Sequence, residues 1–166
     1  ESKNPGIISK IDIKDSYIRE IVNNIQIKDN KKLKVVIDCG NGASGCVAPK
    51  LFKELGCEVI ELYTEIDGNF PNHHPDPSKL ENLTDLVNKV KSSKADVGLA
   101  FDGDGDRIGL ISDIGEVIFP DKIMMIFTEE ILKNKKGSII FDVKCSNALP
   151  NLIKSLSGTP IMSPTG

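Results

Sequence analysis

The segment of this sequence with the clearest chemical potential is residues 102–107, in which three aspartates alternate with two glycines and an arginine ends the run. Along an extended strand, Asp102 and Asp106 would lie about 13 Å apart, whereas Mg²⁺ holds its oxygen ligands at only about 2.1 Å. The backbone must therefore curl, and Gly103 and Gly105 can take the positive φ angles that a tight curl requires. Carboxylates brought together in this way raise one another's pKa unless a cation separates them. The spacing predicts a site for a hard divalent ion, Mg²⁺, formed by Asp102, Asp104 and Asp106.

Two other interpretations of residues 102–107 compete with the magnesium site. Asp-Gly between apolar runs is a strong β-hairpin signal, although a turn needs one such pair and not three aspartates. A calcium EF-hand would use the same aspartates with Asp113 at its twelfth position. That loop needs glycine where Arg107 stands, and helices where this sequence predicts strands. A magnesium site is therefore favoured over a turn alone and over a calcium module.

Arg107 is a candidate catalytic residue because of its position beside the aspartates. A planar, permanently charged guanidinium can bind two oxygens of a phosphate whose other oxygens face a metal ion. An exposed arginine that only neutralises the neighbouring aspartates would account for the same position equally well.

A second motif, residues 40–45, fits the pattern G-x-G-x-x-G between a strand and a helix. Such a loop can place a pyrophosphate at a helix N-terminus, with an acidic residue such as Glu61 binding a ribose further on. Asp38 precedes the glycines and would repel a pyrophosphate, and the motif alone has many false positives. A nucleotide-binding α/β domain that uses Gly40 to Gly45 is nevertheless the alternative function.

Two further features are basic or potentially basic. His73 and His74 are adjacent in a proline-rich loop, so their side chains point in different directions and joint metal binding is not expected. We expect a rigid surface loop, which contact with a neighbouring domain could order. Lys144 follows an apolar strand at its carboxyl end, where an ammonium group can approach a bound anion.

Apolar periodicity predicts alternating strands and helices around these motifs. In the first unit we expect strands at 34–38, 57–63, 96–101 and 107–112, and helices at 16–25, 47–55 and 80–90. The order predicts an α/β fold with a mixed, mostly parallel sheet flanked by helices, and the acidic loop at the carboxyl end of a strand. A second unit begins near Val117, with strands at 117–119, 138–143 and from 161, and helices at 121–132 and 149–156. We therefore divide the chain into residues 1–116 and 117–166, the second being too short to fold alone.

The composition is that of a globular protein, with 39% hydrophobic and 27% charged residues among 166. The formal net charge of −3 argues against a nucleic-acid or membrane-surface role. The four cysteines form no C-x-x-C pair, so reduced thiols and a cytoplasmic location are expected. The chain begins without methionine and ends just after a strand start, so we expect a fragment of a larger enzyme.

Four segments together resemble the α-D-phosphohexomutase family, and most closely its bacterial phosphomannomutase/phosphoglucomutase group. They occur in the family's order, at residues 36–42, 67–77, 102–107 and 141–146. The resemblance covers nearly the whole chain and implies the second domain and the start of the third. It also implies that the glycine loop at residues 40–45 is structural.

For function, the resemblance implies an enzyme that interconverts hexose 1-phosphate and 6-phosphate, of mannose or glucose, through a phosphoserine and a bisphosphate intermediate. Mg²⁺ would be held by the three aspartates and Arg107 would grip the phosphate. Lys144 would contact the sugar phosphate and assist proton transfer, while Thr165 and Gly166 would belong to a substrate-binding segment. Asn147 stands where the family often has arginine. The phosphoserine and the other domains would lie outside the chain, which should be inactive by itself.

Overall fold

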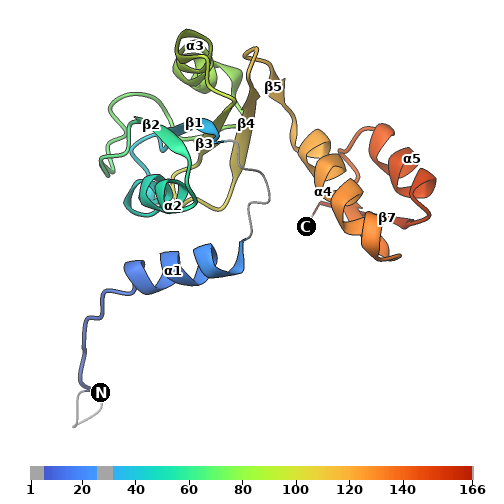
Figure 1. Cartoon of the computed structure of the whole chain (residues 1–166), viewed down its shortest axis with the longest axis horizontal. Coiled ribbons are helices and arrows are strands. Elements are labelled where there is room, and N and C mark those ends of the chain that lie inside the picture. The colour runs from blue at the N-terminus through green and yellow to red at the C-terminus, as the bar shows by residue number, and fades with distance from the viewer. Residues whose placement is uncertain (1–5, 26–31, 166) are drawn as a thin grey trace.

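Five strands form one sheet in the first part of the chain, in the spatial order β2-β1-β3-β4-β5 (Figure 1). The computed structural model describes residues 6–25 and 32–165. The strands are β1 (Lys34–Asp38), β2 (Glu58–Leu62), β3 (Val97–Phe101), β4 (Ile108–Ser112) and β5 (Val117–Ile118). β1 is parallel to β2 and to β3, whereas β4 is antiparallel to β3 and to β5. The predicted mixed α/β class is confirmed, and the parallel part of this sheet is β2, β1 and β3.

The central strand β1 is buried on both faces. Val35 and Val36 are at most 1% exposed, and neighbouring side chains of a strand point to opposite faces. Val36 belongs to the core cluster under α3 (Thr84–Ser93), and Val35 belongs to the cluster under α2 (Ala48–Glu54). Figure 1 shows these helices on opposite sides of the sheet. Full burial of each valine stabilises the fold by about 1.5–3 kcal/mol, so the sheet is a firm base for the loops at its edge.

The β3–β4 pair positions residues 102–107. Phe101 pairs with Ile108 in the antiparallel register, so the segment between them is the connection of a β-hairpin. The segment also follows the carboxyl end of β3, which runs parallel to β1. This edge is where α/β proteins place their ligands, and the sequence predicted the acidic loop there.

The second unit consists of α4 (Pro120–Asn134), β6 (Ser138–Asp142), α5 (Ala148–Ser155) and β7 (Thr159–Ser163). β6 and β7 pair in parallel, and Phe141 and Leu149 are buried in the core between strand and helix. Lys144 lies just beyond β6 and Thr165 just beyond β7. Both residues are therefore at the same edge of this small sheet.

One predicted strand lies in a different unit from the one expected. Residues 117–119 were expected to open the second unit, but β5 pairs with β4 through Leu110–Ile118 and Ile111–Val117. A tight turn at Gly115, whose φ is +82°, folds β5 back on β4. Because a two-residue strand has no periodicity of its own, the sequence could not reveal its partner. The elements of the second unit start with α4.

The remaining elements are the helix α1 (Lys14–Asn24) and two 3₁₀ helices, η1 (Ala43–Cys46) and η2 (Leu80–Leu83). α1 contacts α2 and buries Ile18, which is 1% exposed. Among the residues that the structure describes, no helix combines the length and the apolar character needed to cross a membrane.

Candidate metal and phosphate site

The hairpin loop brings its three aspartates together. One carboxylate oxygen each of Asp102, Asp104 and Asp106 can be chosen so that all three lie within 4.8 Å of one another. Asp102 is only 2% exposed, whereas the other two are exposed. The segment is thus both a hairpin turn and a cluster of carboxylates, and the two interpretations of the sequence are not exclusive. Its flanks are the strands β3 and β4, which removes the EF-hand interpretation.

The curl of the loop depends on one glycine backbone and not on two. Gly105 has a φ of +80°, as expected, but Gly103 is not among the glycines with positive φ, so that expectation is wrong for Gly103. A side chain at Gly103 would make only ordinary van der Waals contacts, with Pro75 at 3.4 Å and Phe70 at 3.6 Å from its Cβ, so packing does not require glycine there. The close approach of another loop could not be read from local spacing.

Asp102 is the structural centre of the loop. Its Oδ1 accepts hydrogen bonds from the backbone N–H groups of Gly105 and Arg107, both at 3.0 Å, and its Oδ2 accepts one from Arg107 Nε at 2.6 Å. Burial acts to raise the pKa of Asp102, but the hydrogen bonds from Arg107 outweigh it and lower the pKa. Asp102 is therefore ionised, and Oδ2 keeps a lone pair for a cation.

The negative charges of the three aspartates repel one another. A hydrogen bond with Asp102 raises the pKa of Asp106, and the charges of Asp104 and Asp102 raise it further. This mutual repulsion is what a bound divalent ion would relieve. Three carboxylates, two of them open to water, fit a hard ion that prefers oxygen ligands and retains some of its water molecules.

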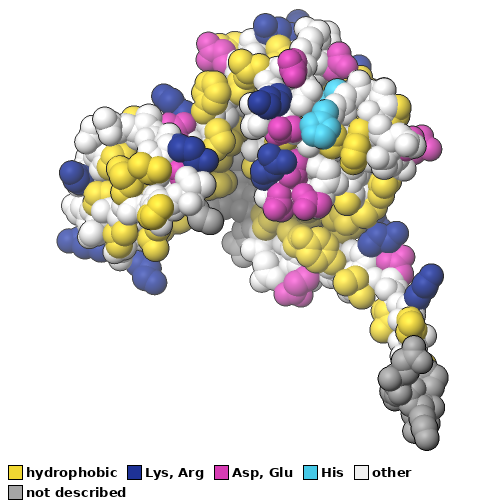
Figure 2. All heavy atoms as spheres, turned by 180° about the vertical axis from the view of Figure 1, so that it is seen from behind, with side chains coloured by type: hydrophobic (Ala, Val, Ile, Leu, Met, Phe, Trp, Pro, Cys, Tyr) yellow, Lys and Arg dark blue, Asp and Glu magenta, His cyan; other side chains and the backbone are white. Residues whose placement is uncertain are grey.

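The guanidinium of Arg107 lies between two carboxylates from different loops. Nε bonds to Asp102 Oδ2, and Nη1 bonds to Asp76 Oδ1 at 3.1 Å. The hydrogen bond to Asp102 raises the pKa of Arg107. Its side chain is still 57% exposed, so Arg107 neutralises aspartates here and also remains accessible to a ligand. Figure 2 shows acidic side chains gathered beside basic and histidine side chains on this face.

Asp76 was not identified as a site residue from the sequence. It lies in the irregular segment of residues 64–79, and its Oδ1 also accepts hydrogen bonds from the backbone and hydroxyl of Ser78. These bonds from Ser78 lower the pKa of Asp76. Asp-Pro-Ser is a turn signal, which marks Asp76 as a turn residue, but its contact with Arg107 depends on the tertiary fold.

The glycine loop at residues 40–45 supports the acidic loop. Ala43 N–H donates to Gly103 O at 2.9 Å. A Cβ on Gly42 would lie 2.7 Å from the same oxygen, so only glycine permits this approach. Close packing between the two loops therefore accounts for the glycine at position 42.

The same loop is unsuited to a pyrophosphate because its amides already have partners. Gly40 N–H donates to Asp38 Oδ1, Asn41 N–H to Tyr63 O, and Gly42 N–H to Cys39 O. Phosphate binding at a helix N-terminus needs free N–H groups. The geometry therefore disfavours the nucleotide-binding alternative.

The two histidines have separate partners, as expected. His73 Nε2 lies 3.1 Å from Asp38 Oδ2, whereas the ring of His74 packs edge-on against Phe70. Their segment is more than a surface loop, because Pro75 is buried against Gly40. It is ordered by contacts within the first unit.

Lys144 and Thr165 meet at a residue that the sequence analysis missed, Asp142. Asp142 Oδ1 accepts from Lys144 N–H, and Oδ2 accepts from Thr165 Oγ1, both at 2.6 Å. The hydrogen bond from Thr165 lowers the pKa of Asp142. Lys144 Nζ is 3.8 Å from Asp142 Oδ2, and the lysine side chain is 73% exposed. Gly166 lies outside the described residues, and Asn147 is the N-cap of α5.

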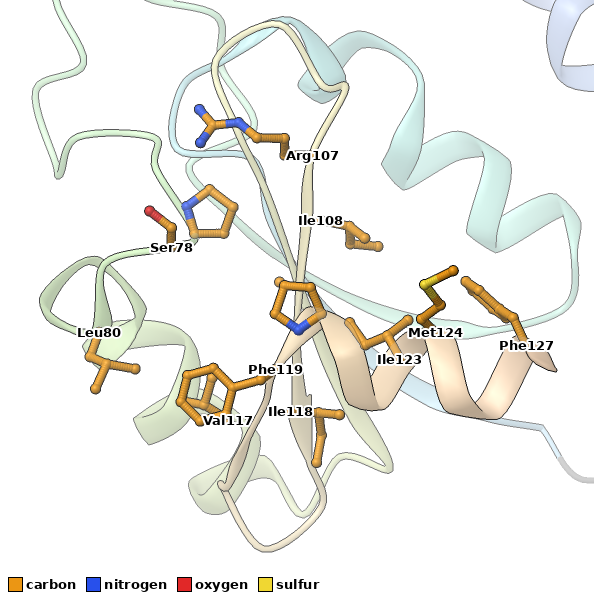
Figure 3. A pocket seen from close by; sticks show the side chains of 13 residues that line it. Ser78, Leu80, Arg107, Ile108, Val117, Ile118, Phe119, Ile123, Met124 and Phe127 are labelled. Carbon is orange, nitrogen blue, oxygen red and sulfur yellow. The ribbon is translucent and has the colours of Figure 1, made fainter. Parts of the chain in front are cut away.

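A pocket of about 530 Å³ lies between the strands β4 and β5 and the helix α4 (Figure 3). Its walls are mostly apolar, as at Ile108, Ile123 and Phe127, and Arg107 and Ser78 are its polar side chains. Sugar hydroxyls need hydrogen-bond partners that such walls lack. The apolar walls of the pocket are therefore poorly suited to a hexose phosphate.

The sequence matches two family models. Residues 15–115 match "Phosphoglucomutase/phosphomannomutase, alpha/beta/alpha domain II", and residues 119–166 match domain III of the same description. The chain is 54% identical over 162 residues to phosphomannomutase/phosphoglucomutase of Pseudomonas syringae pv. tomato, covering 97% of this chain and 34% of the relative. It is 46% identical to phosphoglucomutase of Neisseria gonorrhoeae, covering 97% of this chain and 35% of that protein.

A solved structure gives the same result. The phosphoglucomutase/phosphomannomutase family protein of Burkholderia thailandensis superimposes with a TM-score of 0.88 and 49% identity, over 93% of this chain and 34% of that one. The chain thus spans about a third of the length of the proteins it resembles.

Proposed function

The chain belongs to the phosphoglucomutase/phosphomannomutase family, as the sequence predicted, and we propose that it is part of an enzyme that interconverts hexose 1-phosphate and hexose 6-phosphate. Such an enzyme is an isomerase that works by intramolecular phosphoryl transfer. The observation that carries the proposal is the convergence of three carboxylates beside an accessible arginine. A cytoplasmic location is part of the proposal, and it is consistent with the four free cysteines of the described residues.

Asp102, Asp104 and Asp106 would hold Mg²⁺. When bound, the ion supplies positive charge to phosphate oxygens as charge redistributes during transfer. Asp102 would orient the site because its position is fixed by three hydrogen bonds. Asp104 and Asp106 are exposed and can adjust to the ion. This division between one buried ligand and two exposed ones suits an ion that must also accept a phosphate oxygen.

Arg107 would bind the phosphoryl group next to the aspartates. Phosphoryl transfer needs positioning and charge stabilisation more than covalent help from the protein. Two carboxylates already fix the guanidinium, so little conformational freedom is lost when an exposed N–H edge meets a phosphate.

Lys144 would contact the sugar phosphate and assist the movement of a proton at the reacting hydroxyl. Asp142 would hold the Lys144 backbone and the Thr165 hydroxyl in one arrangement, with Thr165 and Gly166 near the sugar. The donor serine, the residues that read the sugar hydroxyls and the remaining phosphate ligands would come from other domains of the same enzyme. The 166-residue chain should bind metal but not catalyse the reaction alone.

Metal titration tests the proposal directly. Calorimetry should detect Mg²⁺ binding to the 166-residue chain, and Asp104→Asn should remove it. Asp113→Asn is a matched control, because this exposed aspartate lies beyond β4 and outside the cluster. In a calcium EF-hand the same change would remove the twelfth ligand. Loss of binding in Asp113→Asn, with preference for Ca²⁺, would therefore favour a calcium module.

Activity provides the second arm of the test. The longer enzyme that contains this chain should convert glucose 1-phosphate or mannose 1-phosphate to the 6-phosphate with Mg²⁺, and Asp104→Asn should abolish the conversion. Unchanged turnover in Asp104→Asn would contradict the proposed metal site. Absence of turnover in the unmodified enzyme, with both sugars, would contradict the proposed reaction.

A further inference from the structure

The orientation of Arg107 depends on a segment far from it in the sequence. One side of the guanidinium is held by Asp102 in its own loop, but Nη1 is held by Asp76, at 3.1 Å. Asp76 is itself oriented by Ser78, whose backbone N–H and hydroxyl lie 3.1 and 2.7 Å from Asp76 Oδ1. Contacts that hold residues 64–79 in place therefore also hold Asp76, which is the partner of Arg107 Nη1.

Residues 64–79 contain no helix or strand, so side-chain contacts hold that segment in place together with the backbone hydrogen bond from Asp67 N–H to Asn41 O. One of these contacts has a buried partner and is made by His73, three residues before Asp76. Its Nε2 lies 3.2 and 3.1 Å from the two carboxylate oxygens of Asp38. Its Nδ1 lies 3.0 Å from His74 O, so the ring is held at both nitrogens, and the edge of Tyr63 packs against it.

Asp38 makes this contact costly to break. It ends the central strand β1 and is 1% exposed. Burial raises the pKa of Asp38, whereas the neighbouring His73 lowers it. Gly40 N–H gives the carboxylate a further hydrogen bond. Removing the partner of a buried charge is strongly destabilising in general, so His73 is a firm link between this segment and the core of the sheet.

The chain of contacts is continuous. From Asp38 at the end of β1 it passes to His73, then along the backbone past Pro75 to Asp76, and from there to Arg107. Pro75 is buried and lies within van der Waals distance of the positions of Gly40 and Gly103, so it presses the segment onto both neighbouring loops.

We propose that His73 is a positioning residue of the phosphoryl-transfer site, which acts through Asp76 to hold Arg107 in the orientation that binds phosphate. The inference rests on the proposed function for the role of Arg107. The link from His73 to Arg107 is a property of the fold and can be measured without turnover.

Nitrogen-15 arginine labelling measures that link in the 166-residue chain. The sequence contains two arginines, Arg107 and Arg19. Arg19 is exposed on α1 and serves as the internal reference. The Arg107 Nη1–H groups, which face Asp76, should exchange with water about tenfold more slowly than the Nη–H groups of Arg19. His73→Ala should accelerate the Arg107 exchange by about fivefold, and the Arg19 signal should not change.

Three further variants separate positioning from general loosening. Asp76→Ala should accelerate the Arg107 exchange as much as His73→Ala does, and the double variant no further, because both changes break one chain of contacts. His73→Gln keeps an N–H donor at a similar distance from the backbone and should restore most of the protection. His74→Ala is the matched control, because that exposed ring packs on Phe70, and it should leave the exchange unchanged.

Turnover of the longer enzyme supplies the second readout. His73→Ala should lower kcat by about 10- to 100-fold, as small misplacements of catalytic groups do. Asp76→Ala should have a similar effect and the double variant no larger one, with Mg²⁺ affinity changed less than about threefold in each. If His73→Ala does not fold, His73→Asn takes its place, because its shorter amide does not reach Asp38.

The outcomes distinguish this inference from the proposed function. An unchanged Arg107 signal in a folded His73 variant overturns the inference, as do effects of His73→Ala and Asp76→Ala that multiply in the double variant. If the unmodified enzyme lacks mutase activity, the proposed function fails, and His73 then has no catalytic group to position, whatever the exchange data show.

Discussion

Asp102 Oδ2 accepts a 2.6 Å hydrogen bond from Arg107 Nε, so the buried carboxylate of the acidic loop also anchors the arginine beside it. The two residues are five positions apart and face each other across the hairpin connection. The proposed metal site and the proposed phosphate site thus share one residue. A change at Asp102 should affect both, whereas a change at Asp104 should affect the metal alone.

The first prediction separates these roles with two asparagine variants of the 166-residue chain. Asp102→Asn should lower the free energy of unfolding by about 2 kcal/mol, because Arg107 Nε then faces an amide that cannot replace the charged acceptor. Asp104 is exposed, and within residues 6–25 and 32–165 no group donates a hydrogen bond to its carboxylate, so Asp104→Asn should leave the stability without Mg²⁺ nearly unchanged. Urea denaturation in EDTA measures both.

Addition of Mg²⁺ completes that comparison. A ligand that binds the folded state alone stabilises it, by about 2.7 kcal/mol at 100 times Kd. The parent chain should gain this stability, and Asp104→Asn should not. Equal stabilisation of parent and variant by Mg²⁺ would place the ion elsewhere.

The second prediction concerns the contact between the glycine loop and the acidic loop. Gly42→Ala places a Cβ 2.7 Å from Gly103 O and 3.0 Å from Asp102 O. The resulting strain should cost about 1–3 kcal/mol of stability and weaken Mg²⁺ binding. Gly103→Ala is the matched control, since its nearest new contact, Pro75 Cγ at 3.4 Å, is ordinary. Equal effects of the two variants on metal affinity would show that the approach of the loops is unimportant.

The sequence predicted those parts of the site that are encoded by local spacing. The alternation of aspartate and glycine in residues 102–107 indicates a cluster of carboxylates, and the apolar runs on either side indicate strands. Asp76 and Asp142 were not predicted as site residues, because the role of a single carboxylate depends on a partner that is distant in the sequence. Asp76 meets Arg107, 31 positions away, and Asp142 meets Thr165, 23 positions away.

The glycines illustrate the same limit. Positive φ at Gly105 follows from the need for a turn, and the structure has it. The need for glycine at Gly42 arises where a second loop crosses the first, which no one-dimensional pattern contains. The motif at residues 40–45 therefore has the sequence pattern of a nucleotide-binding loop, whereas in the structure it packs against the acidic loop.

The third prediction is a loss of stability at alkaline pH that depends on Cys39. Burial raises the pKa of the Cys39 thiol to about 11, compared with about 8.5 in an unfolded chain. The raised pKa means that the folded state retains the proton while the unfolded state releases it. The contribution of the protonated Cys39 thiol to the free energy of unfolding is therefore fully present below about pH 8.5 and is lost as the pH rises to about 11. It amounts to roughly 3 kcal/mol.

Urea denaturation between pH 8 and pH 10 measures this slope. Cys39→Ala should be less stable at pH 8 but should lose less stability on going to pH 10 than the parent does. Val36→Ala is the control, because it opens a cavity in the neighbouring core and adds no titrating group. Parallel slopes for the parent and Cys39→Ala would contradict the assignment.

The fourth prediction tests whether Lys144 moves a proton or supplies charge alone, in the longer enzyme of which we propose this chain is a part. Its side chain is 73% exposed and its ammonium is 3.8 Å from Asp142 Oδ2, so it can reach a substrate. Lys144→Arg keeps the charge but cannot give up a proton near neutral pH. It should therefore leave KM for the hexose phosphate within about threefold and lower kcat by about 100-fold, a typical loss for general acid–base catalysis.

Initial rates with glucose 1-phosphate measure both, and Lys154→Arg on the exposed face of α5 is the matched control. If Lys144→Arg turns over like the parent while Lys144→Ala raises KM, the lysine contributes charge to binding and the proton is carried by another group.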